Sequence, residues 1–150
     1  MAAIGKFLRL SWREQKLVAG AVLALSAVRI GLITLPFATV RGIVARRYRR
    51  LDDQPSRPAL ERVTWAVEAA SHYVPGGSNC LVRALASEYV LGRFGYPSEL
   101  KIGVAKSAEG ELAAHAWLES DGRVVIGEFE LDRYTELGSA EERKSRAKSR

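Results

Sequence analysis

The single cysteine of the chain, Cys80, stands where a helix is expected to begin. It follows the turn-forming pair Gly76-Gly77, and Ser78 or Asn79 is suited to cap the helix. A thiol at a helix start lies beside unpaired backbone N–H groups and the positive end of the helix dipole, which favour the thiolate. The same N–H groups can hold an oxyanion that forms on an attacked carbonyl. Cys80 is therefore a candidate nucleophile.

A thiol nucleophile needs a base, and the chain contains two histidines. His72 falls near the end of the preceding predicted helix, where we expect it at the surface. His115 falls in the middle of a predicted strand, between alanines that leave space around its ring. His115 is therefore the candidate base. Taken singly, a buried cysteine and a strand histidine are more often structural than catalytic, and it is their combination that favours an enzyme.

The turn after the His115 strand supplies a third candidate. Asp121-Gly122 predicts a two-residue hairpin turn. In that register His115 stands opposite Glu128, with both side chains on one face of the sheet. Glu128 would then orient the imidazole and stabilise its cation, as the third member of a nucleophile–base–orienter set. A one-residue bulge would change the pairing and leave Asp121 or Glu130 as substitutes.

The elements that position these residues are expected to be helices first and strands afterwards. Apolar residues at helical spacing predict helices over residues 11–50, 59–73 and 80–94, and alternating patterns predict strands over 99–105, 112–119 and 123–129. Prolines and aspartates mark a linker at 51–58. The predicted fold class is α+β with an antiparallel sheet, divided into a helical N-terminal region (1–58), a catalytic core (59–137) and an unfolded basic tail (138–150).

Residues 17–40 form an apolar segment long enough to span a bilayer. A charge in its middle, Arg29, and interruptions at Gly31 and Pro36 argue against a span. Basic residues on both sides give little orientation signal, and no signal-peptide cleavage pattern is present. We favour buried helices, broken near Pro36, over a membrane span.

Composition narrows the functional classes. The chain has 150 residues, 47% of them hydrophobic, and a net charge of +6, so it suits one domain with acidic partners. One cysteine excludes an intramolecular disulfide and a multi-cysteine zinc site, and fits a reducing cytoplasm. No phosphate-binding loop or dinucleotide motif is present. We expect no metal, no cofactor and no nucleic-acid partner.

Three runs give the chain a family resemblance over roughly residues 60–137. NCLVRALA at 79–86, GYPSELKIG at 95–103 and AHAWLE at 114–119, followed by Asp121-Gly122, resemble the leader peptidases of lasso-peptide biosynthesis. These are cysteine proteases with a transglutaminase-like or papain-like core. The resemblance implies that Cys80 and His115 are catalytic. The usual third residue of the family is an aspartate after the hairpin turn, and this chain offers Glu128 there instead.

The resemblance also implies a substrate and partners. The substrate would be a ribosomally made precursor peptide, cut between leader and core so that a separate ATP-dependent lasso cyclase can close the macrolactam. Residues 1–58 lack the strand pattern of a fused leader-binding domain, so we expect a separate leader-binding protein. We expect the protein in the bacterial cytoplasm, with its N-terminal region as a docking surface for that protein, the cyclase or the membrane.

Two other functions remain open at this point. A transglutaminase-like core could pass its acyl group to an amine instead of water and act as an acyl transferase. Alternatively, a basic helical protein with an incidental cysteine could be a non-enzymatic binding protein for nucleic acid or a membrane surface.

Overall fold

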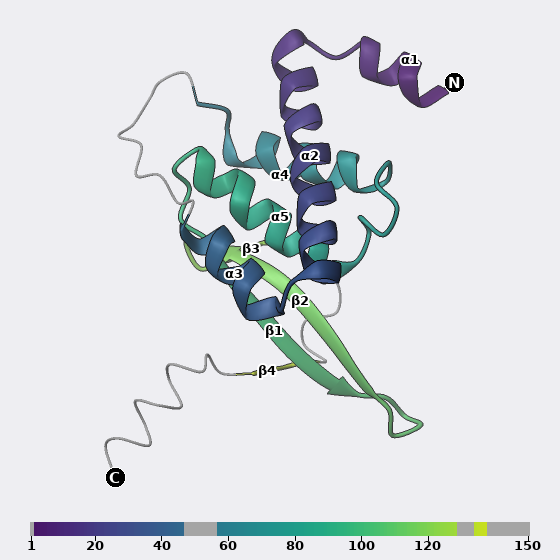
Figure 1. The fold of residues 1–150 in the computed structure, drawn as a ribbon, viewed down its shortest axis with the longest axis vertical. Coiled ribbons are helices and arrows are strands. Elements are labelled where there is room, and N and C mark those ends of the chain that lie inside the picture. The colour runs from purple at the N-terminus through teal and green to yellow at the C-terminus, as the bar shows by residue number, and fades with distance from the viewer. Residues whose placement is uncertain (1, 47–56, 129–133, 138–150) are drawn as a thin grey trace.

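The computed structural model describes residues 2–46, 57–128 and 134–137. Within these residues helices precede strands, which confirms the predicted α+β class (Figure 1). The helices are α1 (Ala2–Leu8), α2 (Trp12–Thr34), α3 (Phe37–Arg46), α4 (Leu60–Ser71) and α5 (Cys80–Arg93). The strands are β1 (Glu99–Lys106), β2 (Leu112–Ser120), β3 (Arg123–Ile126) and β4 (Thr135–Glu136).

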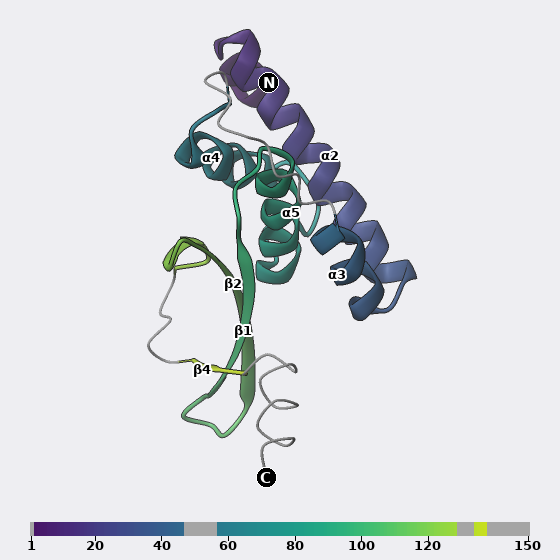
Figure 2. The same cartoon turned by 90° about the vertical axis from the view of Figure 1, so that its left-hand side faces the viewer.

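The helix that begins with Cys80 lies between two layers. On one side α5 packs against the sheet, chiefly against β2, and on the other it packs against α2 and α4 (Figure 2). The strands form one antiparallel sheet in the order β3-β2-β1-β4. The core between these layers includes Leu25, Val67, Leu85, Leu91 and Leu118, all fully buried. The helix that carries Cys80 is therefore at the centre of the hydrophobic core.

The apolar segment near the N-terminus forms a long helix and a shorter one, α2 and α3. Ser11 and Glu14 cap α2 reciprocally, and the chain breaks at Leu35 and Pro36 as predicted. α2 is long and apolar enough to cross a membrane by length and composition. It buries one face against the core, whereas Leu23, Ile30 and Ile33 are exposed. α2 is therefore buried on one face, as expected, and exposed on the other.

The predicted hairpin turn at Asp121-Gly122 forms, and a second turn joins the strands predicted over 99–105 and 112–119. Gly110 has φ +86° in the β1–β2 connection, and Asp121 and Gly122 have φ +50° and +74° between β2 and β3. Positive φ at both central residues is typical of the tight type I′ hairpin turn. β4 is not predicted from the sequence. Its two residues pair with Gly103 and Val104 of β1, and Lys101 donates to Glu136 Oε1 at 2.8 Å.

The N-terminal region and the predicted catalytic core share one interior. α2 packs on both α4 and α5, so the core is continuous across the proposed boundary at residue 58. Of the linker 51–58, only Arg57 and Pro58 are described, and the Tyr96 hydroxyl donates to the Pro58 carbonyl at 2.9 Å. The tail 138–150 lies outside the described residues. The division into regions stays a prediction.

One buried carboxyl of α5 faces a cavity between α3, α5 and the start of β1. The cavity has a volume of about 220 Å³, and Glu88 lines it together with Val44, Tyr96 and Pro97. Within the described parts of the chain, Glu88 Oε2 has no hydrogen-bond partner. Burial raises the pKa of Glu88 from 4.5 to about 7; the attraction of Arg41 opposes this, and the repulsion of Glu99 adds to it.

We expect Glu88→Gln to remove a pH dependence of stability. The folded chain holds the Glu88 proton more tightly than the unfolded chain, so stability falls as pH rises from 4.5 to 7. The shift corresponds to about 3 kcal/mol. Thermal unfolding should give similar Tm values for variant and wild type near the lower pH, and a variant Tm several degrees higher above pH 7. The exposed control Glu111→Gln should follow wild type, and a parallel pH profile for Glu88→Gln would contradict the assignment.

Candidate active site

Cys80 is the first residue of α5, as predicted, and its side chain is half-buried. Asn79 is the N-cap: its Oδ1 accepts the N–H groups of Leu81 at 3.0 Å and Val82 at 3.5 Å. Among the described residues, no acceptor is recorded for the N–H of Cys80 itself. The N–H groups of Leu81 and Val82 are thus already paired. Among the described residues, the Cys80 N–H is the donor that could hold an oxyanion beside the thiol.

The loop that precedes Cys80 is fixed from two directions. Gly77 N–H donates to the Val74 carbonyl at 2.8 Å, and a Cβ on Gly77 would lie 2.7 Å from the Ser71 carbonyl oxygen. From α2, the Arg29 guanidinium donates to the Pro75 carbonyl. Arg29, the one charge in the apolar part of α2, therefore has a structural partner in the loop that precedes Cys80.

His115 lies in the middle of β2 with its Nε2 held by a backbone carbonyl. Nε2 is 2.8 Å from the Gly127 carbonyl oxygen. A carbonyl can only accept, so Nε2 must carry the proton in this bond and Nδ1 is left to accept one. Trp117 stacks with the ring at a centroid distance of 6.2 Å, and Tyr134 lies tilted at 5.1 Å. The bond to Gly127 therefore favours the tautomer in which Nδ1 is the acceptor.

The predicted pairing of His115 with Glu128 is wrong in register. Ser120 pairs with Arg123 and Glu119 with Val124, as predicted, but Leu118 pairs with Ile126. This β-bulge inserts one residue into β3 and shifts every later position by one. No bond joins Glu128 to His115 in the described residues, and Glu128 is exposed.

The bulge leaves the third catalytic role without an assigned side chain. The Gly127 carbonyl occupies the position beside the imidazole that Glu128 was expected to fill. Of the two substitutes, Asp121 is exposed in the hairpin turn and Glu130 lies outside the described residues. A third role for Glu128, Asp121 or Glu130 stays a prediction.

The structure places the two main candidates on elements that pack together. α5 packs on β2, but no hydrogen bond joins the Cys80 thiol to the imidazole within the described ranges. The ring lies on the face of β2 opposite Ala116 and Leu118, which point into the core. The imidazole therefore lies on the face of β2 that is turned away from α5, and the described structure does not bring His115 and Cys80 together. Proton transfer between them would need β2 and α5 to rearrange.

Two glycines that make room at this site were missed by sequence reasoning. Gly127 has φ +82°, and a Cβ there would lie 2.9 Å from the Ala116 carbonyl oxygen. A Cβ on Gly103 would lie 2.8 Å from Trp117 Cζ3. A glycine inside or at the end of a strand pattern is the signal that could have found them, because it often marks a close approach of another part of the backbone or a side chain.

In the described part of the chain, no three His, Cys, Asp or Glu side chains gather as a metal site would require.

The fold is α+β, with a cysteine at the start of a helix and a histidine in a strand of the sheet that packs on this helix. The chain belongs to the transglutaminase-like superfamily, whose family model matches residues 22–139. This superfamily has a cysteine-protease-like fold. The match begins within α2 and takes in α3, α4, α5 and the sheet. No curated protein and no solved structure matches the chain.

Proposed function

We propose that this protein is a cysteine peptidase that removes the leader from a lasso-peptide precursor. The observation that carries the proposal is the position of Cys80 as the first residue of α5, with its own N–H unpaired among the described residues. Membership of the transglutaminase-like superfamily supports cysteine-protease chemistry. The finer assignment is supported by the runs around Cys80 and His115 that resemble lasso leader peptidases.

The proposed reaction uses the two side chains in turn. Once a rearrangement has brought the ring to the thiol, His115 Nδ1 takes the proton of Cys80, and the thiolate attacks the carbonyl of the last leader residue. The Cys80 N–H stabilises the oxyanion. The imidazolium then protonates the amine of the core peptide, which leaves as the C–N bond breaks. Water attacks the remaining thioester with His115 as base, releasing the leader as a carboxylic acid and restoring the thiol.

The proposed partners are the precursor, a separate leader-binding protein and an ATP-dependent lasso cyclase, all in the bacterial cytoplasm. The described part of residues 1–58 is helical and contains no strand. This supports a form that relies on another protein to capture the leader. The role of the cut is to free the amine of the core peptide, which the cyclase then joins to a side-chain carboxyl.

Mass spectrometry of the precursor, incubated with the leader-binding protein and this chain, tests the proposal. Cleavage gives a leader and a core whose combined mass exceeds that of the precursor by one water. Omission of the leader-binding protein should slow the reaction. An intact precursor after incubation with both proteins would contradict the peptidase assignment.

Superfamily membership equally supports transfer of the acyl group to an amine. In that case an amine, rather than water, attacks the thioester. A glutamine-derived crosslink loses ammonia, so the product would be lighter than the two reactants combined. The same mass spectra therefore separate an acyl transferase from a peptidase.

A further inference from the structure

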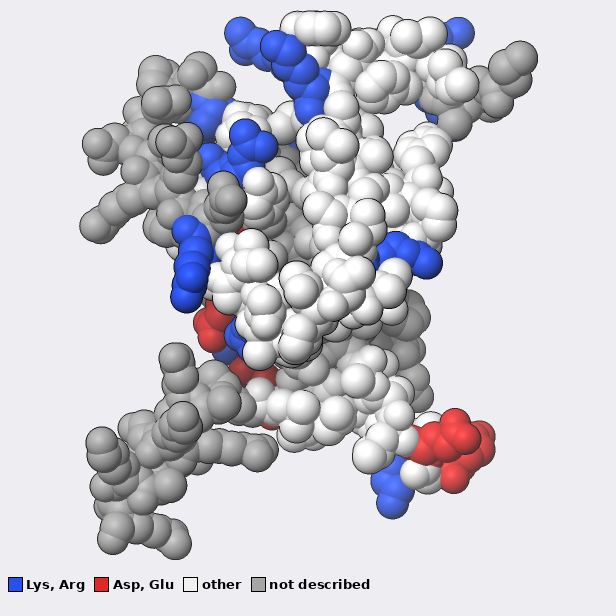
Figure 3. All heavy atoms as spheres, viewed as in Figure 1, with Lys and Arg blue, Asp and Glu red and all other residues white. Residues whose placement is uncertain are grey.

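α2 carries an apolar stripe along the face that the core does not cover. Leu23, Ile30 and Ile33 are 72%, 61% and 73% exposed. Trp12, at the start of the helix, falls on the same stripe because helical spacing places residues 12, 23 and 30 on one side. Figure 3 shows this side of α2 as a surface almost free of charge between its ends.

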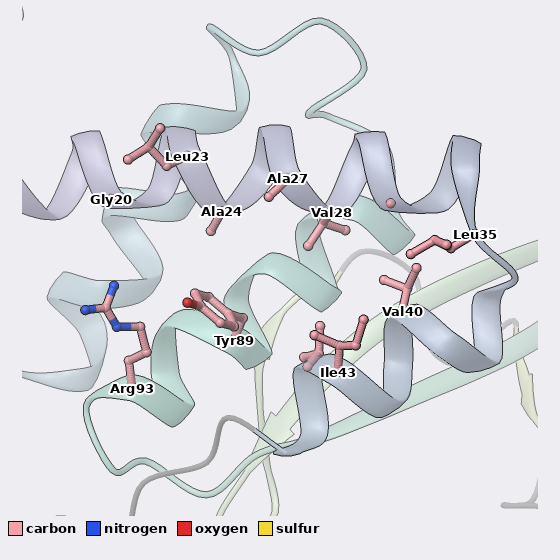
Figure 4. A pocket seen from close by; sticks show the side chains of 12 residues that line it. Gly20, Leu23, Ala24, Ala27, Val28, Leu35, Val40, Ile43, Tyr89 and Arg93 are labelled. Carbon is pink, nitrogen blue, oxygen red and sulfur yellow. The ribbon is translucent and has the colours of Figure 1, made fainter.

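Apolar residues of α1 and α3 extend the stripe, and a cavity lies on each side of it. On one flank, Ile4 of α1 lines an almost wholly apolar cavity of about 480 Å³ together with Leu23 and Val22. On the other flank, a cavity of about 460 Å³ lies between α2, α3 and α5, lined by Leu35 and Ile43 among others (Figure 4). We call this surface the α2 face; it comprises Ile4, Trp12, Leu23, Ile30, Ile33, Leu35 and Ile43.

Basic side chains are frequent around the α2 face, and acidic side chains are almost absent from this part of the chain. Residues 2–46 contain seven lysines and arginines and one acid, Glu14. That acid is engaged with Arg62 at 2.7 Å and with the Ser11 cap. Lys16 lies over the Trp12 ring at 5.1 Å, and Arg13, Lys16 and Arg93 line a further groove beside α2. A partner for this surface must therefore be apolar in its interior and negatively charged at its edge.

We propose that the α2 face docks in the plane of an anionic lipid bilayer. An apolar stripe with a tryptophan and flanking cations is the pattern of helices that lie in the membrane interface. Between residues 17 and 33 only Ser26 and Arg29 are polar, and Arg29 bonds to Pro75. A protein partner would normally form about ten hydrogen bonds across its interface, whereas lipid chains need none.

An in-plane position fits the packing better than a span. Val18, Ala21, Ala24, Leu25 and Val28 are buried against the core. A spanning α2 would expose this whole face to lipid and would break the bond from Arg29 to the nucleophile loop. With α2 on the membrane, the sheet lies on the far side of α5 (Figure 2). The candidate active site, on α5 and β2, would then lie on the side of α2 that faces away from the membrane.

Co-sedimentation of the full chain with lipid vesicles tests this docking. We expect binding to phosphatidylcholine vesicles that contain phosphatidylglycerol and weaker binding to phosphatidylcholine alone. Salt should weaken the binding to the anionic vesicles, because it screens their attraction to the basic side chains. Leu23→Glu combined with Ile30→Glu should weaken binding by at least about tenfold, because two exposed apolar side chains that would enter the bilayer are replaced by charged ones. The matched control is Leu112→Glu on the β1–β2 hairpin, where the side chain is 76% exposed, and it should bind like wild type.

Trp12 gives a second readout that does not depend on the double variant folding. Brominated lipid should quench the emission of wild type, and Trp12→Phe should lose most of that quenching. Absence of wild-type binding to anionic vesicles would overturn the proposal. So would vesicle binding that the double variant, shown to be folded by circular dichroism, retains in full. Binding of a soluble protein to this face in place of lipid would assign it to a protein interface instead. Cleavage in lipid-free solution should not change in the double variant, so this test is independent of the peptidase assay.

Discussion

Cys80→Ala and His115→Ala are each expected to abolish cleavage of the precursor. Removal of the thiol leaves no nucleophile, and removal of the imidazole leaves no group to take its proton. Groups that act as one unit show losses of similar size when removed singly, so each rate should fall on the order of a thousandfold or more. Single-turnover rates followed by mass spectrometry, with enzyme in excess over precursor, measure the loss.

His72 supplies the matched control for the histidine substitution. It is the other histidine of the chain and is exposed at the C-terminal end of α4. His72→Ala should therefore cleave at the wild-type rate. Circular dichroism of Cys80→Ala and His115→Ala should show a folded protein. If His115→Ala were as active as His72→Ala, the base would have to be another group, and the role given to the Gly127–His115 bond would be lost.

The elements around Cys80 were predictable because their signals are local. Asn79 caps the helix with its own side chain, and Asp121-Gly122 adopts the positive φ values that a tight hairpin turn requires. Each of these features depends on a few adjacent residues. The start of α5, the β2–β3 turn and the break before α3 were therefore correct within a residue or two.

The environment of His115 was not predictable, because it depends on contacts between distant residues. The bulge in β3 changes which atom meets the imidazole, and no local pattern in Arg123–Ile126 announces it. Tyr134, which packs against the ring, precedes a two-residue strand too short to show alternation. Apolar content likewise predicted α2 as a helix but could not show that one of its faces would stay uncovered.

Gly127→Ala is expected to damage both stability and catalysis. The residue has φ +82°, where an L side chain costs about 1–2 kcal/mol. Its Cβ would also lie 2.9 Å from the Ala116 carbonyl oxygen and 3.1 Å from Trp117 Cβ, and such overpacking costs roughly 1–3 kcal/mol. We expect Tm to fall by several degrees. The strand end must shift to relieve the overlap, and the Gly127 carbonyl then moves away from His115 Nε2.

Gly122→Ala separates the backbone cost from the positioning of the base. Gly122 has a similar φ of +74°, but no atom lies within 4 Å of the place its Cβ would take. It should lose only the conformational part of the stability and retain full activity. Gly127→Ala, by contrast, should lower kcat by on the order of tenfold to a hundredfold with KM little changed, because the imidazole is displaced rather than the substrate site. If the two glycine variants had equal kcat values and equal losses of Tm, the carbonyl would be a packing contact and not the group that orients His115.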